Sequence, residues 1–429
     1  MPSQRFPHVL SAVVVLSGMC VMSPAVAVAD TSSQVDLVGP AGSVAFGEEV
    51  VVLPNGNIVV VDPLSSVGGP NAGAVHLFDG DTLELISTLV GTEAGDGIGS
   101  GGITVVGGSN FVVCSPSWRS DQVVGIHATG AATFVNGVSG LDGAVSATNS
   151  LVGPGASEFP LCGAGVTVLA NGNYVVATAT ATADGWATWG SGATGVSGVV
   201  ALGNSLHGPW QVVPLANGHY VATLTTAADA TDLVTWGNGA GGTVGEATAA
   251  NSREGHLTAA SSVTALSDGS YVVTSPDSAD TRGTVTWVSG AGPSSGPLTA
   301  SHTLTGRASG SRIGSGGVVP VGNGNFVVRS HGNGLGSTVD FRAAGSGNAT
   351  QGAVALTAGF AGCHFEEFLL VCSVVEPGNA DVAALTNGNF VVLTGTDGGT
   401  QGDHLAATWG SGSAGVSGSL SWSDTISSH

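Results

Sequence analysis

One short pattern recurs along the chain: an Asn-Gly or Asp-Gly pair between two apolar runs. The clearest copy is "LANGNYVV", residues 169–176, and others read "LPNGNIVV", "LANGHYVA", "LSDGSYVV", "VGNGNFVV" and "LTNGNFVV". Such a pair is the strongest short signal for a β-hairpin with a type I′ turn, in which both central residues have positive φ. The pattern therefore predicts the same hairpin at intervals of about 55 residues, the spacing expected of a repeat fold.

Two further motifs accompany each hairpin and define a repeating unit. The apolar residue after the turn is Ile58, Phe111, Tyr174, Tyr220, Tyr271, Phe326 and Phe390. An aromatic follows in a segment like "WATWGSG", at Phe78, Phe134, Trp189, Trp236, Trp287, Phe341 and Trp409. Segments like "NSLVG" end most units. Four short strands per unit predict an all-β fold: a β-propeller of about seven four-stranded antiparallel blades.

A β-helix or another solenoid is the alternative fold. Its coils are shorter than these units, and its parallel strands cannot be joined by two-residue hairpins. We expect the repeated aromatics to pack between blades, and a ring of sugar-binding aromatics is the alternative. Residues 35–39 resemble the end of an "NSLVG" strand, so we expect them to complete or flank the last blade.

The N-terminus has the features of a secretory signal peptide. "MPSQRF" carries one Arg, an apolar run follows, and "SPAVAVAD" offers small residues at cleavage spacing. We therefore expect residues 1–29 to be removed and residues 30–429 to form a single repeat domain, secreted or held at the cell surface. No later run is long and apolar enough to span a membrane.

The chain is strongly acidic. It has 29 Asp and Glu against 8 basic residues, all of them Arg, for a net charge of −21. This charge argues against nucleic acid and anionic membranes as partners. Only 9% of the residues are charged and Gly counts 71, a composition shared by disordered chains and repetitive secreted β-proteins. The β-branched runs favour the second class.

Four cysteines remain after the signal peptide, an even number that suggests disulfides in an exported chain. Cys363 and Cys372 form the first predicted bridge because they are close in sequence. Cys114 and Cys162 pair by elimination, although three connectivities are open.

The repeat fails between residues 361 and 379, "AGCHFEEFLLVCSVVEPGN". The binding candidates there are Phe365, Glu366, Glu367 and Phe368, in a loop that presents apolar and acidic groups to a partner. The alternative is a disulfide-closed hairpin that extends or covers one blade. A metal site at His364 and Glu366 is a further reading.

Other chemistry has little support in the sequence. The best Ca²⁺ candidates are Asp79, Asp81 and Glu84 in "FDGDTLE", which lacks a full set of oxygen ligands and is equally a turn. We expect no cofactor. No H-E-x-x-H or G-x-S-x-G motif frames a catalytic residue.

The motifs "LANGNYVV", "WATWGSG" and "GNSLHG" resemble a repeat of unknown function found in bacterial secreted and filamentous-haemagglutinin-like exoproteins. The resemblance covers nearly all of the mature chain. It implies a bacterial exported protein and transfers no catalytic residue. We expect a monomeric binding or adhesion module for an extracellular protein or glycan. An enzyme acting on extracellular polysaccharide, or a structural array without ligand, is the alternative.

Overall fold

The computed structural model describes most of the chain in the following ranges. They are residues 35–120, 128–155, 160–178, 185–208, 211–224, 232–255, 257, 260–298, 302–332, 336–344, 353–355, 360–366, 369–374, 380–396, 404–414 and 426–427. Gly39–His429 forms one compact unit. The predicted signal peptide, residues 1–29, lies outside the described residues. The described part contains no helix that is long and apolar enough to cross a membrane.

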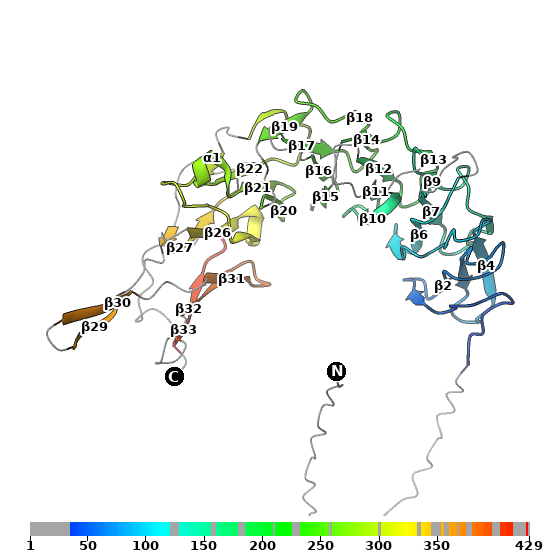
Figure 1. The fold of residues 1–429 in the computed structure, drawn as a ribbon, viewed down its shortest axis with the longest axis horizontal. Coiled ribbons are helices and arrows are strands. Elements are labelled where there is room, and N and C mark those ends of the chain that lie inside the picture. Colours follow the sequence, from blue (N-terminus) through cyan, green and yellow to red (C-terminus); the bar gives the residue numbers. More distant parts are fainter. Residues whose placement is uncertain are drawn as a thin grey trace, which may run out of the picture. The chain divides into compact units, whose positions relative to one another are not determined.

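The fold is all-β (Figure 1), and each of seven sheets contains four antiparallel strands, to which four of the sheets add a fifth strand. Each sheet is one blade, and the strands of a blade follow one another in sequence. Blade 1 is β1 (Glu49–Val52), β2 (Ile58–Asp62), β3 (Ala74–Phe78) and β4 (Leu85–Val90). Blade 2 is β5 (Ile103–Val106), β6 (Asn110–Ser115), β7 (Ala131–Val135) and β9 (Leu151–Val152). Blade 3 is β10 (Leu161–Val168), β11 (Tyr174–Thr178), β12 (Trp186–Gly190) and β14 (Leu206–His207).

The remaining blades repeat this order. Blade 4 is β15 (Gln211–Pro214), β16 (Tyr220–Leu224), β17 (Asp232–Gly237) and β19 (Ser252–Gly255). Blade 5 is β20 (Ser262–Ala265), β21 (Tyr271–Ser275), β22 (Thr284–Val288) and β24 (Thr303–Thr305). Blade 6 is β25 (Gly317–Pro320), β26 (Phe326–Gly332), β27 (Gly336–Arg342) and β28 (Ala353–Ala355). Blade 7 is β31 (Ala380–Ala384), β32 (Phe390–Thr396), β33 (His404–Gly410) and β34 (Ile426–Ser427). The predicted β-propeller class is confirmed.

Four blades gain a fifth strand from the next repeat. These two-residue strands are β8 (Gly143–Ala144), β13 (Gly198–Val199), β18 (Gly245–Glu246) and β23 (Gly296–Pro297). In the sequence, each short strand lies between the third and fourth strands of one blade. In space, it pairs in parallel with the fourth strand of the preceding blade. This pairing covers an edge that would otherwise expose unpaired backbone groups.

The apolar core is divided into clusters that lie between consecutive blades. Between blades 3 and 4, for example, Val175 and Leu206 pack against Tyr220 and Ala222, all of them buried. Five other clusters join the remaining successive pairs from blade 1 to blade 7 among the described residues. The residue after the turn is therefore a packing residue, as expected.

The Asn-Gly turn differs from the predicted type I′ geometry. In the copy at residues 169–173, Gly172 has φ +82°. The Gly172 N–H donates to the Leu169 carbonyl at 2.9 Å, and the Leu169 N–H donates to the Asn173 carbonyl at 2.8 Å. Asn171 is not among the described residues with positive φ. The turn is a three-residue loop that ends in a left-handed glycine. Only the copy in blade 6 has positive φ at both Asn323 and Gly324.

The asparagine instead joins two blades. The donors to the Gly239 carbonyl of blade 4 are Asn171 Nδ2 at 2.8 Å, Asn173 Nδ2 at 2.9 Å and Trp189 Nε1 at 2.9 Å, all from blade 3. We call this arrangement the glycine clamp. In other copies the side-chain donors and their glycine carbonyl acceptors are Asn55 and Asn57 with Gly137, Asn110 with Gly192, Asn217 and Trp236 with Gly290, and Asn325 with Gly412.

Two sequence expectations need correction. Val59 of blade 1 is equivalent to Val175 of blade 3, and Val175 pairs with the repeat's aromatic residue, Trp189. Because Val59 pairs with Leu77, Leu77 and not Phe78 occupies the aromatic position in blade 1. Residues 35–39 form no strand, and the fourth strand of blade 7 is β34 from the end of the chain.

Candidate functional site

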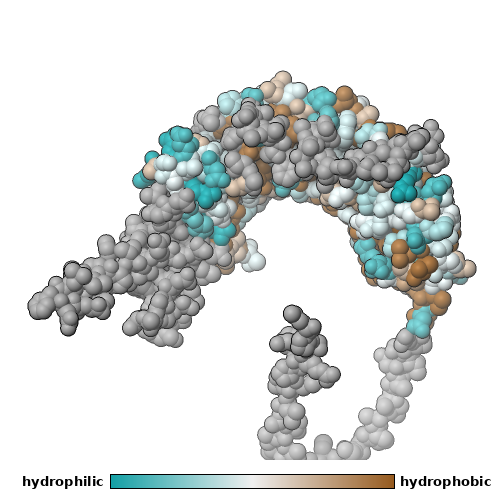
Figure 2. All heavy atoms as spheres, viewed as in Figure 1, coloured by the Kyte–Doolittle hydropathy of each residue, from teal (hydrophilic) through white to brown (hydrophobic). Residues whose placement is uncertain are grey.

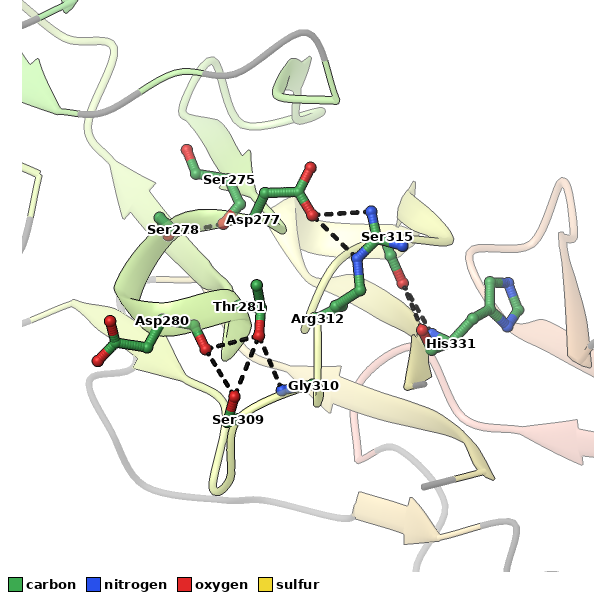
Figure 3. Close-up of polar contacts among 10 residues, drawn as sticks. All are labelled: Ser275, Asp277, Ser278, Asp280, Thr281, Ser309, Gly310, Arg312, Ser315 and His331. Atoms are coloured by element: carbon green, nitrogen blue, oxygen red, sulfur yellow. Dashed lines mark hydrogen bonds and ion pairs between the residues drawn. The ribbon is translucent and has the colours of Figure 1, made fainter. Parts of the chain in front are cut away.

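The polar site that stands out lies on the loops of blades 5 and 6. The loop between β21 and β22 contains the short helix α1 (Ser278–Thr281), and the loop between β24 and β25 spans residues 306–316. Figure 3 shows polar side chains of the two loops meeting. Hydrophilic residues gather around α1 in Figure 2.

An ion pair joins the two loops. Arg312 reaches Asp277 Oδ1 with Nη2 at 2.8 Å and Nε at 2.9 Å, and about a third of each side chain is exposed. Both contacts use one carboxylate oxygen. An exposed pair of this kind contributes little to stability, about 0–1 kcal/mol. Its clearer effect is to position the guanidinium beside the loop surface.

A hydroxyl network holds the same loops together. Thr281 Oγ1 and Ser309 Oγ are 3.2 Å apart, and Ser309 Oγ donates to the Asp280 carbonyl at 3.0 Å. The Gly310 N–H donates to Thr281 Oγ1 at 3.0 Å. These bonds link α1 to residues 309–310 of the second loop.

Backbone strain marks these loops. Ala279, Asp280, Thr281 and Arg312 have φ of 51°, 57°, 62° and 44°. Residues without glycine's freedom adopt this left-handed region at a cost of order 1–3 kcal/mol each, and such residues cluster at functional sites.

A second loop of the same construction shows that this strain is not required by the fold. Residues 91–102 join blades 1 and 2 and also contain "IGSGG". In that loop the Ile98 N–H donates to the Ala72 carbonyl at 3.0 Å. In the loop that joins blades 5 and 6 the Ile313 N–H donates to the Arg282 carbonyl at the same distance. Gly97, with φ +55°, takes the place of Arg312. The chain thus carries a strained arginine where glycine would serve the fold.

A serine and a histidine lie side by side in the site without forming a catalytic pair. Ser315 Oγ donates to the His331 backbone carbonyl at 3.2 Å, and the imidazole points away from it (Figure 3). Nucleophilic catalysis would need the hydroxyl bonded to the ring. Burial, with a smaller effect of Arg329, lowers the pKa of His331 below its usual value. The lowered pKa favours the neutral imidazole at pH 7.

Positive charge is concentrated in this part of the chain. Six of the eight arginines are Arg253, Arg282, Arg307, Arg312, Arg329 and Arg342. Arg282, Arg307 and Arg312 lie on the two loops, and Arg307 is exposed. Sequence reasoning counted the arginines but missed their clustering, which was visible in the sequence.

The sequence-predicted metal candidates form a turn. Asp79 Oδ1 accepts the Asp81 N–H at 3.0 Å, the Thr82 N–H at 2.8 Å and the Thr82 hydroxyl at 3.0 Å. These hydrogen bonds, the Thr82 N–H first, lower the pKa of Asp79. No group of three or more metal-ligating side chains occurs among the described residues. The Ca²⁺ assignment stays a prediction.

The cysteine-rich insertion is a β-hairpin, β29 (Phe360–Glu366) with β30 (Leu369–Val374), which forms a separate two-stranded sheet. Its register places Cys363 directly opposite Cys372. Phe365 and Glu366 are on β29, whereas Glu367 and Phe368 lie outside the described residues. Their binding role and the Cys363–Cys372 bridge stay predictions.

Cys114 of β6 and Cys162 of β10 form a disulfide with a Cα–Cα distance of 5.7 Å. The bond ties blade 2 to blade 3.

Comparison with known proteins identifies a repeat family. Five stretches match the model of a repeat of unknown function (DUF5650): residues 105–159, 168–211, 214–261, 265–315 and 384–426. They correspond to the units of blades 2, 3, 4, 5 and 7. No curated protein matches the chain.

Among the solved structures that match the chain, two illustrate how low the scores are. Kuenenia stuttgartiensis hydrazine synthase has a TM-score of 0.30 and 12% identity over 86% of this chain and 80% of its own. A eukaryotic initiation factor has a TM-score of 0.28 and 10% identity over 86% of each chain. Both scores are too low to support an argument about fold or function.

Proposed function

Because the chain belongs to the family of DUF5650 repeats, whose description assigns no function, we propose a function from the site itself. The protein is an exported binding module that takes a carboxylate-bearing extracellular glycan on the loops of blades 5 and 6. The observation that carries the proposal is the group of three loop arginines, Arg282, Arg307 and Arg312, in a chain of net charge −21.

The chemistry of the loops fits such a ligand. Guanidinium groups bind carboxylates through charge-assisted hydrogen bonds. The hydroxyls of Thr281 and Ser309 and the carboxylate of Asp280 can bond sugar hydroxyls. Long-range repulsion by the acidic chain would slow the approach of an acidic glycan, so binding would be carried by these short-range contacts and not by steering.

Two features support export. The N-terminal sequence resembles a signal peptide. The Cys114–Cys162 disulfide is typical of proteins that leave the reducing cytosol.

An array of neutral, uronate-containing and sulfated glycans, probed with the purified protein, tests the proposal. We expect uronate-containing glycans to bind and neutral ones to fail. Arg307→Gln should weaken binding roughly tenfold, the loss of about one charge-assisted hydrogen bond. Arg307 has no ion-pair partner in the described chain, so the substitution leaves the loops intact.

Arg119→Gln is the matched control, since Arg119 is exposed and lies outside the cluster. It should bind as the unsubstituted protein does. An equal loss of glycan affinity in both variants would mean that net charge, and not the loop arginines, determines binding. Binding of neutral glycans alone would refute the choice of ligand.

A protein ligand on the β29–β30 hairpin is the second candidate. The observation that favours it is that this hairpin forms its own sheet apart from the seven blades. Deletion of residues 360–374 should abolish protein capture while glycan binding remains.

A further inference from the structure

Two polar residues break the repeat at the interface between blades 4 and 5, and the first is on a fourth strand. In blades 1, 2 and 3 one position of this strand holds a leucine that is buried in the cluster facing the next blade: Leu89, Leu151 and Leu206. Arg253 holds this position in blade 4, because it pairs with Val234 as Leu206 pairs with Ala187. An arginine thus replaces an apolar residue of the core.

The second residue is in the turn that precedes the fourth strand. In blades 2, 3 and 4 an asparagine closes this turn, accepting a backbone N–H from three residues earlier and donating to the carbonyl five residues earlier: Asn149, Asn204 and Asn251. His302 holds the position in blade 5, where it precedes Thr303 as Asn251 precedes Ser252. His302 Nδ1 is buried and has no hydrogen-bond partner among the described residues. The histidine therefore does not make the bonds of the asparagine that it replaces.

Both residues line one small cavity between blades 4 and 5. Its other walls come from blade 5: Thr286, Trp287 and Val288 of β22, with Pro297 and Leu298. The free volume, about 20 Å³, has room for roughly one water-sized group. Pro297 is exposed, and Arg253, Trp287 and His302 are partly buried, so the cavity can be reached from the surface.

The guanidinium in this cavity has donors to spare. Arg253 Nε donates to Ser294 Oγ at 3.2 Å, and Arg253 forms no ion pair among the described residues. A guanidinium carries five N–H donors and a permanent charge, so one neutral hydroxyl satisfies little of its capacity. Glu254 follows on the strand and points to the opposite face, and no acidic side chain is among the described residues that line the cavity. A partly buried charge of this kind is stabilised by an anionic partner.

We infer that this cavity binds the carboxylate group of a small organic acid. Arg253 and the Nδ1–H tautomer of His302 donate to the carboxylate oxygens, and Trp287 forms an apolar wall. Because the cavity has room for one small group, the rest of the acid lies outside it, over the exposed Pro297. The two departures from the repeat are explained together, since each supplies a donor that the leucine and asparagine of the other blades do not.

The cavity is separate from the loops to which we assigned the glycan. Those loops lie before the first residue of β22 and after the last residue of β24. The cavity lies near Val288, the last residue of β22, and His302, directly before β24. The two sites are therefore at opposite ends of the same strands, and the inference does not rest on the proposed glycan function.

Thermal unfolding of the full-length oxidised protein, with sodium acetate as the probe, tests the inference. Ligand that binds only the folded state raises the midpoint. We expect 100 mM acetate to raise it by roughly 2 °C over the same concentration of NaCl, which corrects for ionic strength. Acetamide has the shape of acetate without its charge and should have no effect. No difference between acetate and NaCl, or an equal effect of acetamide, would overturn the inference.

A double variant returns the cavity to the residues of the other blades. Arg253→Leu with His302→Asn should fold with a midpoint at least as high as that of the unsubstituted protein, because Leu206 and Asn204 serve these positions in blade 3. It should lose the acetate effect. Arg253→Gln is the milder variant that keeps most of the side chain, and it should weaken acetate binding at least tenfold. Acetate binding that survives both variants would refute the site.

Arg307→Gln is the matched control, since it removes a charge from the glycan loops and leaves the cavity intact. Its acetate effect should equal that of the unsubstituted protein. Saturation-transfer NMR of the acetate methyl group should show the same order, with signal in Arg307→Gln and none in the double variant. The reverse order would place the acetate on the loops and overturn the inference while supporting the glycan proposal.

Discussion

At the scale of single residues, the repeat motif is explained by contacts between strands and between blades. The tyrosine after the turn packs its ring against the glycine of the next strand: a Cβ on Gly190 or Gly237 would collide with the ring of Tyr174 or Tyr220. In blade 1 the smaller residue, Ile58, follows the turn and the larger residue, Phe78, is its partner on the next strand. The partner is not always a glycine, since Tyr271 pairs with Val288 and Phe326 pairs with Arg342.

The three tyrosines of the chain, Tyr174, Tyr220 and Tyr271, are all buried, which predicts an unusual alkaline titration. Burial raises the pKa of Tyr220 and of Tyr271 to about 12 and raises that of Tyr174 further. Tyrosinate absorbance should therefore stay flat through pH 10, where an exposed tyrosine ionises. It should then rise in one step as the protein unfolds.

The sign of the stability change follows from proton linkage. Between pH 10 and the folded-state pKa the unfolded chain binds fewer protons than the folded one, so stability is complete below pH 10 and falls as pH rises. The loss is about 1.4 kcal/mol per pH unit for each tyrosine. In guanidinium chloride all three should titrate near pH 10, and a similar titration in native buffer would contradict the burial.

At the scale of elements, the sequence predicted the strands that have a repeating pattern and missed those that do not. Tyr174 and Trp189 mark β11 and β12 through their recurrence. The fifth strand β13 is only two residues, Gly198–Val199, and no periodicity can identify so short a segment. The turn type was also wrong, since the preference for Asn171 comes from its bond to Gly239 in another blade and not from local φ.

The Cys114–Cys162 disulfide joins two blades and closes a segment with a sequence separation of 48. On the chain-entropy model such a loop contributes about 4 kcal/mol. The double variant Cys114→Ala with Cys162→Ala should therefore lose roughly this free energy of unfolding in urea titrations. The unsubstituted protein under reducing conditions should lose at least as much, because the reductant also opens the predicted Cys363–Cys372 bridge. A change below about 1 kcal/mol in both would contradict a structural role.

At the scale of the whole molecule, the site was predictable only in part. The clustering of arginines between Arg253 and Arg342 can be read from the sequence. The contacts of Arg312 with Asp277 and of Thr281 with Ser309 cannot, because they depend on two loops about 30 residues apart that the stacking of blades 5 and 6 brings together. The strained φ of Arg312 has no sequence signal either, and it is found only by comparison with Gly97 in the equivalent loop.

The net charge of −21 gives the molecule a self-repulsion that salt should relieve. At pH 7, raising NaCl from about 10 mM to about 1 M shortens the screening length from roughly 30 Å to 3 Å. The midpoint of thermal unfolding should rise, on the order of 5 °C.

The same titration near pH 4.5, the isoelectric point, is the control, because the repulsion there has vanished and the rise should be much smaller. An equal rise at both pH values would assign the effect to general salting-out of apolar surface. A fall with salt at pH 7 would mean that attractive pairs, such as Asp277 with Arg312, outweigh the repulsion among the acids.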